Sequence, residues 1–561
     1  MMSAADPQVL IVGAGPVGLT LAAVLLRQGV SCRIIDLNEA PPPWSRGVLL
    51  QARTLELLDG LGLAEEAVQR GRRIRGIGLY VQGERQAHVR LEGMDTPYPF
   101  VLALPQQHIE RMLADRVERL GGVLERGVRL ASFAQQPEAV WAELVRSGGE
   151  REWLRVPWLV GCDGGFSAVR TGLGLPFEGE DYGLVALQAE LDIRWPLPLP
   201  ADEVLAFFSP AGPLAALPLG LDRWRLLVLQ PQTSDVEPSL ENLQALVQAR
   251  GPAGMVLSDP AWVAGFHIRR RMAPRFRVGR VLLAGDAAHV QSPLMGQGMN
   301  LGMQDACNLG WKLGLVARGK AAPQLVDTYE EERLPVATEV LEAADEITRT
   351  FVGFMTMQGP QVSQVREAVL PLLARTHAFV ERLSRGAGML GTSYRGSSIV
   401  GEYRGWDESE RAQGCFYDFA PGPEPGDRAV DAVLAEPVQG CHRLGQLLHG
   451  PAHTLLLFAG SETHDGTEAL VEVAEHVVER YGELVRPLLI LPEGRVAPER
   501  PPFVHLISDR GGTLHHRYGA RGACLYLVRP DGHVGFRGHP VESPPLLAHL
   551  EALLAPGRSE D

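Results

Sequence analysis

The feature that most constrains the fold is a glycine-rich turn between an apolar strand and an apolar helix near the N-terminus. Residues Gln8–Val12 are almost wholly apolar, the sequence GAGPVG follows at residues 13–18, and Leu19–Gln28 has helical character. In such a unit Gly13 permits a tight turn, and Gly15 lets backbone N–H groups approach a pyrophosphate. The last glycine lets the helix pack closely on the strand, and the helix dipole favours the negative charge of the pyrophosphate.

A second predicted strand, Ser31–Ile35, ends in Asp36. That carboxylate lies where a dinucleotide-binding fold presents an acid to the ribose hydroxyls. Strand, turn, helix, strand and terminal acid in this order predict a Rossmann-type site for an adenosine diphosphate group. The order by itself does not distinguish FAD from NAD.

Two further predicted strands end in a pair formed by glycine and an acid. One ends at Asp163-Gly164 and the other at Gly285-Asp286. The second pair leads through Pro293–Asn300 into a helical pattern over Leu301–Leu315. The chain therefore has two further strands that end in glycine and an acid, in addition to the strands of its first motif.

With these three motifs in this order, the chain resembles the class A flavoprotein aromatic hydroxylases, the family of p-hydroxybenzoate hydroxylase, phenol hydroxylase and the polyketide hydroxylases. Supporting matches are Arg46 with Arg53–Glu56, Gln106 in Leu104–Gln106, and Tyr329–Pro335. The resemblance extends from Gln8 to Pro335 and implies that FAD is the bound dinucleotide.

The resemblance also implies a role for each matching residue. Asp36 would hold the adenosine ribose, and Asp286 the ribityl chain of FAD. Asp163 would serve FAD and a transient nicotinamide site together, and Arg46 and Gln106 would contact FAD from neighbouring elements. Backbone N–H groups at a helix start would face the isoalloxazine and stabilise the anionic reduced flavin. The expected cofactor-binding residues are Gly13, Gly15, Pro16, Val17, Gly18, Asp36, Arg46, Gln106, Asp163, Asp286, Gly298, Met299 and Asn300.

Two positions depart from the family pattern. Gly47 replaces the usual alanine, which loosens the local backbone, and Leu294-Met295 stands where small residues are usual, which would narrow the pocket beside the flavin. Pro293 is expected to pack beside the flavin and the substrate. His289 is interpreted as structural, because a lone histidine is weak evidence for a general base. No catalytic acid or base is assigned.

The expected fold is α/β, with a Rossmann-type FAD-binding domain, an inserted substrate-binding sheet and a C-terminal thioredoxin-like domain. Short β-like segments alternate with proline- and glycine-rich turns at Leu184–Leu191, Val204–Phe208, Leu214–Leu219 and Trp224–Leu229. By resemblance, this sheet covers the flavin and lines the substrate cavity together with Ile74–Val81. We expect the FAD domain in residues 1–75, 100–180 and 270–345, the sheet domain in 76–99 and 181–269, a helical region and linker in 346–430, and the thioredoxin-like domain in 431–561.

The C-terminal part shows a strand–helix–strand–hairpin–helix order. Strands are predicted at His453–Phe458 and Arg486–Leu491, a helix at Glu468–Tyr481, a hairpin turn at Arg529–Gly532 and a last helix at Pro544–Leu554. This order resembles the thioredoxin-like tail of the phenol and polyketide hydroxylases. It contains no Cys-x-x-Cys pair, so a packing or dimerisation role is favoured over dithiol chemistry. A homodimer is one expectation.

Composition and charge exclude several classes of partner. The chain has 561 residues and a formal net charge of −14, which argues against a nucleic-acid ligand. Its six cysteines form no Cys-x-x-Cys pair, so a disulfide scaffold or a zinc site is not expected, and a reducing cytoplasm is. The uncharged stretch Val9–Leu26 is long enough to span a membrane, but its glycines and proline favour a strand, a turn and a helix.

These expectations define an FAD-dependent monooxygenase that consumes NADPH or NADH and O₂. By resemblance, reduced flavin would form a hydroperoxide with O₂ and hydroxylate a phenolic or polyketide-like aromatic substrate. The alternatives are a Baeyer–Villiger or epoxidising monooxygenase on the same scaffold, and a non-catalytic flavoprotein that sequesters an aromatic ligand.

Overall fold

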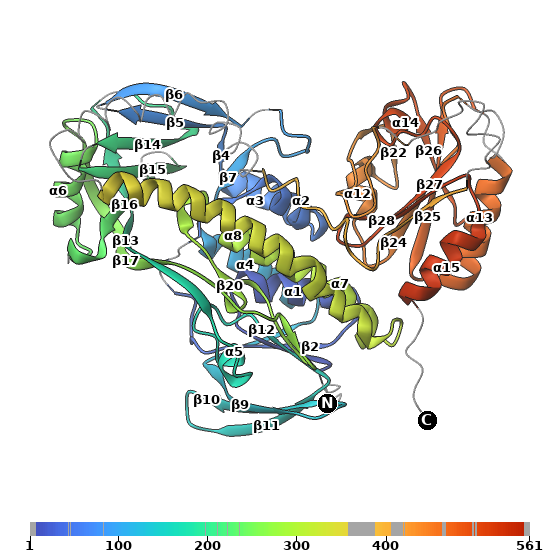
Figure 1. The fold of residues 1–561 in the computed structure, drawn as a ribbon, viewed down its shortest axis with the longest axis horizontal. Coiled ribbons are helices and arrows are strands. Elements are labelled where there is room, and N and C mark those ends of the chain that lie inside the picture. Colours follow the sequence, from blue (N-terminus) through green and yellow to red (C-terminus); the bar gives the residue numbers. More distant parts are fainter. Residues whose placement is uncertain are drawn as a thin grey trace.

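The structure is a computed structural model. It describes residues 7–356, 388–405, 419 and 421–554, apart from short gaps at 43, 45–46, 82, 92, 197, 210, 221–222, 235, 463–466, 496–498 and 500–501. Residues 357–387 and 406–418 of the predicted helical region and linker lie outside these residues. Three sheet-containing parts lie along the longest axis: an eight-stranded sheet at one end, the nucleotide-binding part in the middle and the C-terminal part at the other end (Figure 1).

The nucleotide-binding part is built on a six-stranded sheet with the order β18-β19-β12-β1-β2-β8. Strand β1 pairs in parallel with β2 and β12, and β12 pairs in parallel with β19. The three strands that carry the glycine and acid motifs are therefore neighbours, and their carboxyl ends meet at one edge of the sheet. The strands are β1 (Val9–Val12), β2 (Cys32–Asp36), β8 (Val123–Arg126), β12 (Trp158–Gly161), β18 (Arg277–Val278) and β19 (Val281–Leu283).

Helices α1 and α7 pack closely beside this sheet. Most of α7 is buried, and a Cβ on Gly302 would lie 2.6 Å from Val17 and 2.9 Å from the Gly285 Cα. Glycine is therefore required where α7 crosses the first and third motifs. The elements of this part are α1 (Pro16–Arg27), α2 (Ala52–Gly60), α3 (Ala64–Arg70), α4 (Gln106–Arg119), α5 (Ala168–Gly172), α7 (Gly298–Ala317), β3 (Leu49–Leu50), β4 (Arg72–Ile74), β7 (Val101–Ala103), β9 (Val128–Gln135), β10 (Val140–Arg146) and β11 (Arg151–Val156).

The second sheet has eight strands in the order β20-β17-β13-β16-β15-β14-β5-β6. All four predicted β-like segments of residues 184–229 fall inside its strands. Within residues 74–81, Ile74 ends β4, which belongs to another sheet, and β5 begins at Gly76. The bounds are β5 (Gly76–Val81), β6 (Glu84–Arg90), β13 (Glu178–Arg194), β14 (Glu203–Ser209), β15 (Gly212–Gly220), β16 (Arg223–Pro231), β17 (Val256–Met272) and β20 (His289–Val290).

One face of this eight-stranded sheet is covered by α6 (Leu240–Arg250), and we call the opposite face the inner face. Residues of one strand parity, among them Leu187, Leu205 and Leu226, pack with Leu243 and Val247 of α6. The side chains of the alternate residues in each strand lie on the inner face, toward the nucleotide-binding part. Helix α8 (Asp327–Thr356) runs along the molecule between this sheet and the C-terminal part (Figure 1).

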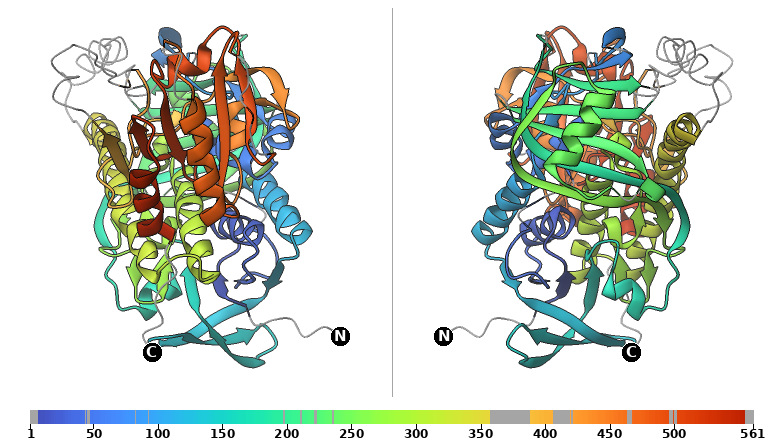
Figure 2. Two further views of the ribbon diagram at one scale, coloured as in Figure 1. Left: turned by 90° about the vertical axis from the view of Figure 1, so that its right-hand side faces the viewer. Right: turned by 90° about the vertical axis from the view of Figure 1, so that its left-hand side faces the viewer.

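The C-terminal part contains a six-stranded sheet with the order β21-β28-β27-β24-β25-β26 and helices on both faces (Figure 2). The predicted hairpin is confirmed, since β27 and β28 pair in antiparallel around 529–532. The thioredoxin-like assignment stays a prediction. The elements are β21 (Gly401–Arg404), β22 (Val433–Val438), β23 (Cys441–Arg443), β24 (His453–Phe458), β25 (Val485–Pro492), β26 (His505–Asp509), β27 (Cys524–Val528), β28 (Val534–His539), α12 (Leu444–Leu448), α13 (Thr467–Tyr481), α14 (Thr513–Arg517) and α15 (Ser543–Leu554).

A group of buried ions, which we call the junction cluster, joins the C-terminal part to α7 and α8. It consists of Lys312, Glu332, Arg529 and Asp531, whose side chains are at most 3% exposed. Arg529 donates to both oxygens of Glu332 at 2.6 and 2.8 Å, and Lys312 Nζ donates to Glu332 at 2.7 Å. Burial opposes ionisation, but Arg529 and Lys312 hold the pKa of Glu332 well below its usual range.

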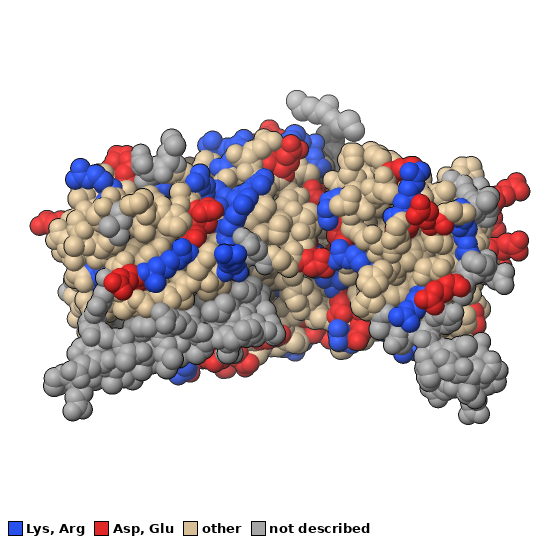
Figure 3. Space-filling view, turned by 90° about the horizontal axis from the view of Figure 1, so that it is seen from above, with Lys and Arg blue, Asp and Glu red and all other residues tan. Residues whose placement is uncertain are grey.

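Acidic and basic side chains are interspersed on the face seen from above (Figure 3). Within the described residues, no helix is long and apolar enough to cross a membrane, and no cluster of three or more potential metal ligands is found. Strand β1, the turn and helix α1 account for the uncharged stretch at 9–26.

Candidate active site

A cavity of about 380 Å³ lies at the carboxyl edge of the nucleotide-binding sheet. We call it the cofactor cavity. Its wall combines the β1–α1 turn, the short 3₁₀ helix η2 (Gly285–Ala287), the start of α4 and the start of α7 with the inner face of the eight-stranded sheet. The predicted site residues that line it are Gly15, Pro16, Val17, Gln106, Asp286, Pro293, Gly298 and Met299.

Gly13 and Gly18 shape the first turn from behind. Gly13 has a φ of +104°, and a Cβ on it would lie 2.3 Å from the carbonyl oxygen of Cys162. A Cβ on Gly18 would lie 2.0 Å from the Gly13 carbonyl oxygen. No side chain larger than hydrogen fits at either position, so these glycines permit the approach of strands and helix that exposes Gly15 to the cavity.

Asp36 stands at the end of β2 beside the same turn. Its carboxylate accepts hydrogen bonds from the backbone N–H of Ala14 at 2.7 Å and of Asn38 at 2.8 Å. It is not among the residues that line the cofactor cavity. The structure thus gives Asp36 a role in holding the turn, and its contact with a ribose remains a prediction.

Asp163 binds the first turn of the short helix α5, whose N-cap is Ser167. Its carboxylate accepts from Ser167 Oγ at 2.5 Å and from the backbone N–H groups of Ala168 and Val169 at 2.7 and 3.2 Å. Burial raises the pKa of this carboxyl, while the three hydrogen bonds oppose the rise. Its neighbour Gly164 lines the cofactor cavity, so Asp163 supports the cavity wall by ordering the turn that follows β12.

The N-terminus of α7 points at the cofactor cavity. Gly298, its first residue, lines the cavity, and no atom lies within 4 Å of the position that a Cβ would occupy. The next residue but one, Asn300, is fully buried and does not line the cavity. Its side chain accepts from the Gln51 N–H at 2.9 Å and donates to the carbonyl oxygens of Leu49 and Gly296 at 2.8 and 2.9 Å. Asn300 therefore fixes the loop that precedes α7.

Gln106 joins two segments of the wall. It exchanges hydrogen bonds with the backbone of Gly47, and its side-chain amide donates to Glu110 at 2.7 Å. A Cβ on Gly47 would lie 2.8 Å from Gln106 Oε1 and 3.2 Å from Met299 Sδ. The segments that contain Gly47, Gln106 and Met299 therefore approach one another closely. The glycine that was expected to loosen the local backbone lies at this contact. Arg46 lies outside the described residues.

Behind the cavity, one buried carboxylate holds the third motif against α7. Asp305 accepts from the Gly285 N–H at 3.1 Å, contacts His289 Nε2 at 2.7 Å and accepts from Arg333 Nε at 2.8 Å. Burial opposes its ionisation, but Arg333 and His289 lower the pKa of Asp305. His289 is 1% exposed and directed at this carboxylate, in agreement with its interpretation as structural.

The residues present fit FAD. Gly15 and Gly298 leave open space in front of two helix N-termini, where backbone N–H groups suit a pyrophosphate and an anionic ring. Across the cavity, Ser292 is 1% exposed, and its Oγ and the side-chain amide of Gln291 have no hydrogen-bond partner among the described residues. Buried polar atoms normally find a partner, so the wall is ready for a polar ligand.

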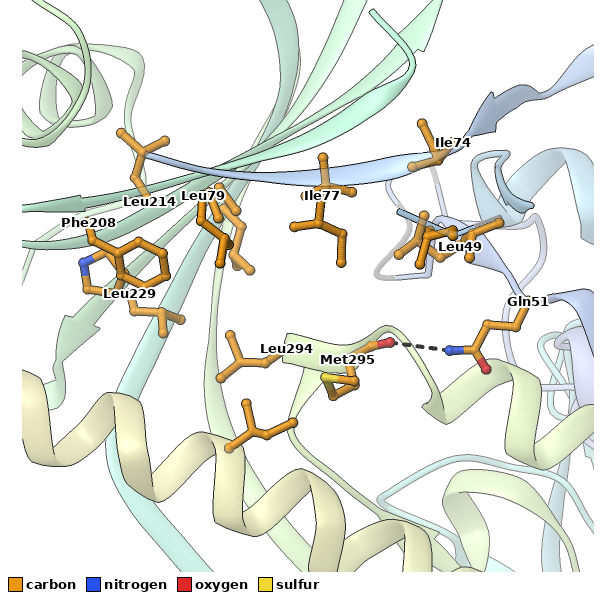
Figure 4. A pocket seen from close by; sticks show the side chains of 18 residues that line it. Leu49, Gln51, Ile74, Ile77, Leu79, Phe208, Leu214, Leu229, Leu294 and Met295 are labelled. Atoms are coloured by element: carbon orange, nitrogen blue, oxygen red, sulfur yellow. Dashed lines mark hydrogen bonds between the residues drawn. The ribbon is translucent and has the colours of Figure 1, made fainter. Parts of the chain in front are cut away.

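A second, apolar chamber of about 170 Å³ opens beside the cofactor cavity. The two share Leu49, Val204, Ala215, Leu227 and Leu294. Figure 4 shows Ile77 and Leu79 on one wall, facing Leu294 and Met295 on the other. Gln51 lies at one end, where its amide donates to the Met295 carbonyl oxygen at 3.4 Å (Figure 4). The Leu294-Met295 pair does form part of the pocket wall, as its position predicts.

Several cavity residues escaped the sequence-based prediction. Gln188 and Arg225 reach the cofactor cavity from the inner face, together with His267 of β17. Gln188 interrupts the apolar run from Leu184 to Ala189, and Arg225 stands between Trp224 and the apolar run Leu226–Leu229. These interruptions were the available signal. A polar side chain at the position of a buried apolar one marks either a paired group or a ligand contact.

Fold and site together define a class of protein: an enzyme with a dinucleotide cofactor at a sheet edge and an apolar chamber beside it. A family model described as an FAD binding domain matches residues 6–344. The chain is 35% identical to 6-methylpretetramide 4-monooxygenase of Streptomyces rimosus, over 98% of this chain and 93% of the relative. It is 31% identical to pentachlorophenol 4-monooxygenase of Sphingobium chlorophenolicum, over 98% and 97%.

Solved structures agree. A ternary complex of aklavinone-11 hydroxylase with FAD and aklavinone has a TM-score of 0.74 and 27% identity, and the match covers 99% of this chain and 100% of that one. The chain belongs to the FAD-binding family of aromatic monooxygenases, and it is an FAD-dependent enzyme that hydroxylates aromatic substrates.

Proposed function

We propose that FAD lies with its pyrophosphate at the N-terminus of α1 and its isoalloxazine at the N-terminus of α7, and that the aromatic substrate lies against the inner face of the eight-stranded sheet. One observation carries this proposal. The apolar chamber opens on the cofactor cavity at Leu294, one residue after Pro293 and four before Gly298. A ligand in the chamber therefore extends toward the ring of a flavin at the start of α7.

Each wall residue then has a definite task. Gly15 brings the N–H groups of α1 to the pyrophosphate, and Asp286 accepts from the ribityl hydroxyls. The N–H groups of Gly298 and Met299 face the flavin ring, where the helix dipole stabilises negative charge. Pro293 packs beside the ring and the substrate. Asp36 contacts the ribose while it continues to hold the turn, and Gly13, Gly18, Asp163 and Asn300 position these contacts.

The bound flavin supplies the redox chemistry that moves electrons from NADPH or NADH to O₂ and one oxygen atom to the substrate. The protein must orient the substrate and keep water out, and the apolar chamber suits both tasks. Its lining is aliphatic except for Phe208 and the amide of Gln51. A phenolic or polyketide-like substrate with an extended apolar body fits this lining better than a small benzoate.

The test is an assay of the FAD-loaded enzyme with NADPH or NADH and a panel of phenols and polycyclic aromatic compounds. We expect one class of compound to accelerate NAD(P)H consumption and to gain a single oxygen atom derived from labelled O₂. The matched control is Asp286→Ala, which should lose FAD. Tight binding without turnover would contradict the proposal and favour sequestration, and a labelled lactone or epoxide would favour the alternative monooxygenases.

Location and assembly complete the proposal. The five described cysteines are free thiols, which supports a reducing compartment such as the cytoplasm. The C-terminal part, whose sheet has helices on both faces, is proposed to be thioredoxin-like in fold and to act in packing or in a homodimer. Light scattering of the purified protein measures the assembly state. A chain truncated before the C-terminal part is a control only if it folds.

A further inference from the structure

Helix α8 contributes to the wall of the apolar chamber. Among its described residues, Ile347 lines the chamber and is 7% exposed. The helix packs against the 3₁₀ helix η3 (Pro293–Met295), and Leu294 and Met295 of η3 line the same chamber. Figure 4 shows α8 as the pale yellow helix on that side of the chamber. The place of Ile347 in the wall therefore depends on how this end of α8 is held.

One carboxylate fixes α8 to the eight-stranded sheet. Asp345 accepts hydrogen bonds from Tyr182 Oη of β13 at 2.6 Å and from Arg349 Nε, one helical turn later, at 2.9 Å. Arg270 Nη1 of β17 lies 3.4 Å from Asp345 Oδ2, and Arg349 also pairs with Glu180 of β13. Burial opposes the ionisation of Asp345, but Tyr182 and Arg349 lower its pKa. The Asp345 carboxylate is therefore bound by two strands and by its own helix.

Tyr182 lies in a β-bulge, a feature that redirects side chains near active sites. The register between β13 and β17 shifts between Asp181 and Val185. The Tyr182 ring packs against a hydrophobic cluster that includes Leu229, and Leu294 packs against the same cluster. Because Leu229 and Leu294 line the chamber, Tyr182 connects α8 to the chamber wall from behind.

Asp345 and Ile347 lie on opposite flanks of the buried face of α8. This face contains Leu341, Ala344 and Thr348, which are at most 2% exposed. Successive residues of an α-helix are rotated by about 100°. Asp345 therefore lies about 100° to one side of Ala344, and Ile347 about 60° to the other side. A rotation of α8 that released Asp345 would change how far Ile347 projects into the chamber.

We propose that Asp345 is a positioning residue and that Ile347 determines which substrates fit the chamber. The contacts of Asp345 with Tyr182 and Arg270 hold α8 at one rotation, and Ile347 then limits the size of the apolar group that enters. This inference rests on the proposed function, because it places the substrate in the chamber. The substrate class is an aromatic compound whose apolar extension has a limited size.

The probes are 4-n-alkylphenols from 4-ethylphenol to 4-octylphenol, titrated into FAD-loaded enzyme without NAD(P)H. Binding is measured from the change in the visible spectrum of the oxidised flavin. Affinity should rise about fourfold for each CH₂ group that enters the chamber and stop rising when the chamber is full. We call the longest alkyl chain that still gains affinity the alkyl limit. Ile347→Ala shortens the wall residue and should raise the alkyl limit by roughly one or two CH₂ groups.

Further variants test the role of Asp345. Asp345→Asn keeps the shape of the side chain but removes its charge, and Tyr182→Phe removes one hydrogen bond but keeps the ring. Each should raise the alkyl limit and leave the affinity for 4-ethylphenol within about twofold. Asp345→Asn should have no further effect when Ile347 is already alanine, because it acts through that side chain. Asp327→Asn is the control, since it removes the ion pair with Arg277 at the other end of α8.

Three results would overturn the inference. The first is an unchanged alkyl limit in Ile347→Ala, or a wild-type enzyme that shows no limit or does not bind the series. The second is an unchanged limit in both Asp345→Asn and Tyr182→Phe, and Tyr182→Phe alone decides this point if Asp345→Asn does not fold.

The third is an equal rise from Asp345→Asn with and without the Ile347 side chain. A merely structural role of Asp345 would lower the melting temperature without moving the alkyl limit. These outcomes are distinct from failure of the proposed function, which is measured by substrate-stimulated NAD(P)H consumption and oxygen incorporation.

Discussion

The cofactor cavity and the junction cluster are both rich in polar groups, but they use them differently. In the junction cluster, Glu332 accepts from Arg529 and Lys312, and Asp531 accepts from Arg529 and Trp311. At the cavity wall, Ser292 and Gln291 keep side-chain atoms without a partner among the described residues.

This difference shows how to divide motif residues into structural and ligand-binding groups. A buried polar group that is satisfied within the protein holds the fold together, while one that faces a cavity with spare hydrogen-bonding capacity awaits a ligand. Asp163 and Asp305 belong to the first kind, although both stand in or next to the motifs. The helix start at Gly298 belongs to the second.

The largest effect is expected from breaking the junction cluster. Glu332→Ala leaves Arg529 and Lys312 buried without their shared carboxylate, which costs about 3–5 kcal/mol. Differential scanning calorimetry should show a large loss of thermal stability. Glu331→Ala is the control, because Glu331 contacts Ser398 at the surface and its loss should cost roughly 0.5 kcal/mol or less. Equal stability of the two variants would contradict the account of the cluster.

Two motif acids should separate cofactor binding from structural support. Asp286→Ala removes hydrogen bonds to FAD worth about 1.5–3 kcal/mol, a loss of roughly 10–150-fold in FAD affinity by fluorescence titration. Asp163→Ala removes the hydrogen bonds to Ser167 and to the first turn of α5 and should cost about 1 kcal/mol of stability, with FAD affinity changed much less. A greater loss of FAD affinity in Asp163→Ala than in Asp286→Ala would contradict the assignment of Asp163 to structural support and of Asp286 to cofactor binding.

Mild acid should weaken the C-terminal part more than the cofactor cavity. Burial lowers the pKa of His453 from 6.5 to about 3. The unfolded chain therefore binds more protons between these values, so the contribution of His453 is complete above pH 6.5 and is lost as pH falls toward 3. The loss between pH 6.5 and 5 is about 2 kcal/mol. His453→Leu should flatten the pH dependence of unfolding, and the exposed His516→Gln should not.

The smallest effect is expected at Gly47. The added Cβ of Gly47→Ala would contact the ends of two flexible side chains, Gln106 and Met299, which can shift by a few tenths of an ångström. FAD affinity should therefore change by about twofold, or roughly 0.4 kcal/mol. A tenfold loss would show that the Gly47–Gln106 contact is rigid and directly supports the cofactor.

The nucleotide-binding part was predictable because its determinants are local. Glycine is required at positions 13 and 18 because an added Cβ would lie only 2.3 or 2.0 Å from a backbone carbonyl oxygen of the same strand–turn–helix unit or of the neighbouring strand end. The order of apolar strands and terminal acids along the chain therefore predicts which strands lie next to each other in the sheet. The resemblance to the flavoprotein hydroxylases, rather than this local reasoning, indicated Pro293, Gly298 and Met299, and all three line the cofactor cavity.

The polar residues of the inner face and the junction cluster were not predicted, because both depend on pairings between distant segments. Gln188 and Arg225 come together only through the register of β13 and β16. Glu332 and Arg529 are separated by 197 residues. Tyr329–Pro335 was assigned to the flavin family as a whole, and its contact with the C-terminal part could not be read from its own residues.

The central claim is that one flavin occupies the cofactor cavity with its ring at the start of α7. A crystal structure of the enzyme with bound FAD measures this directly. We expect the pyrophosphate at the N–H groups of the Gly15 turn, the isoalloxazine against Gly298 and Met299, and the apolar chamber open to the ring. FAD bound elsewhere, or a ring separated from the chamber by the Leu294 segment, would contradict it.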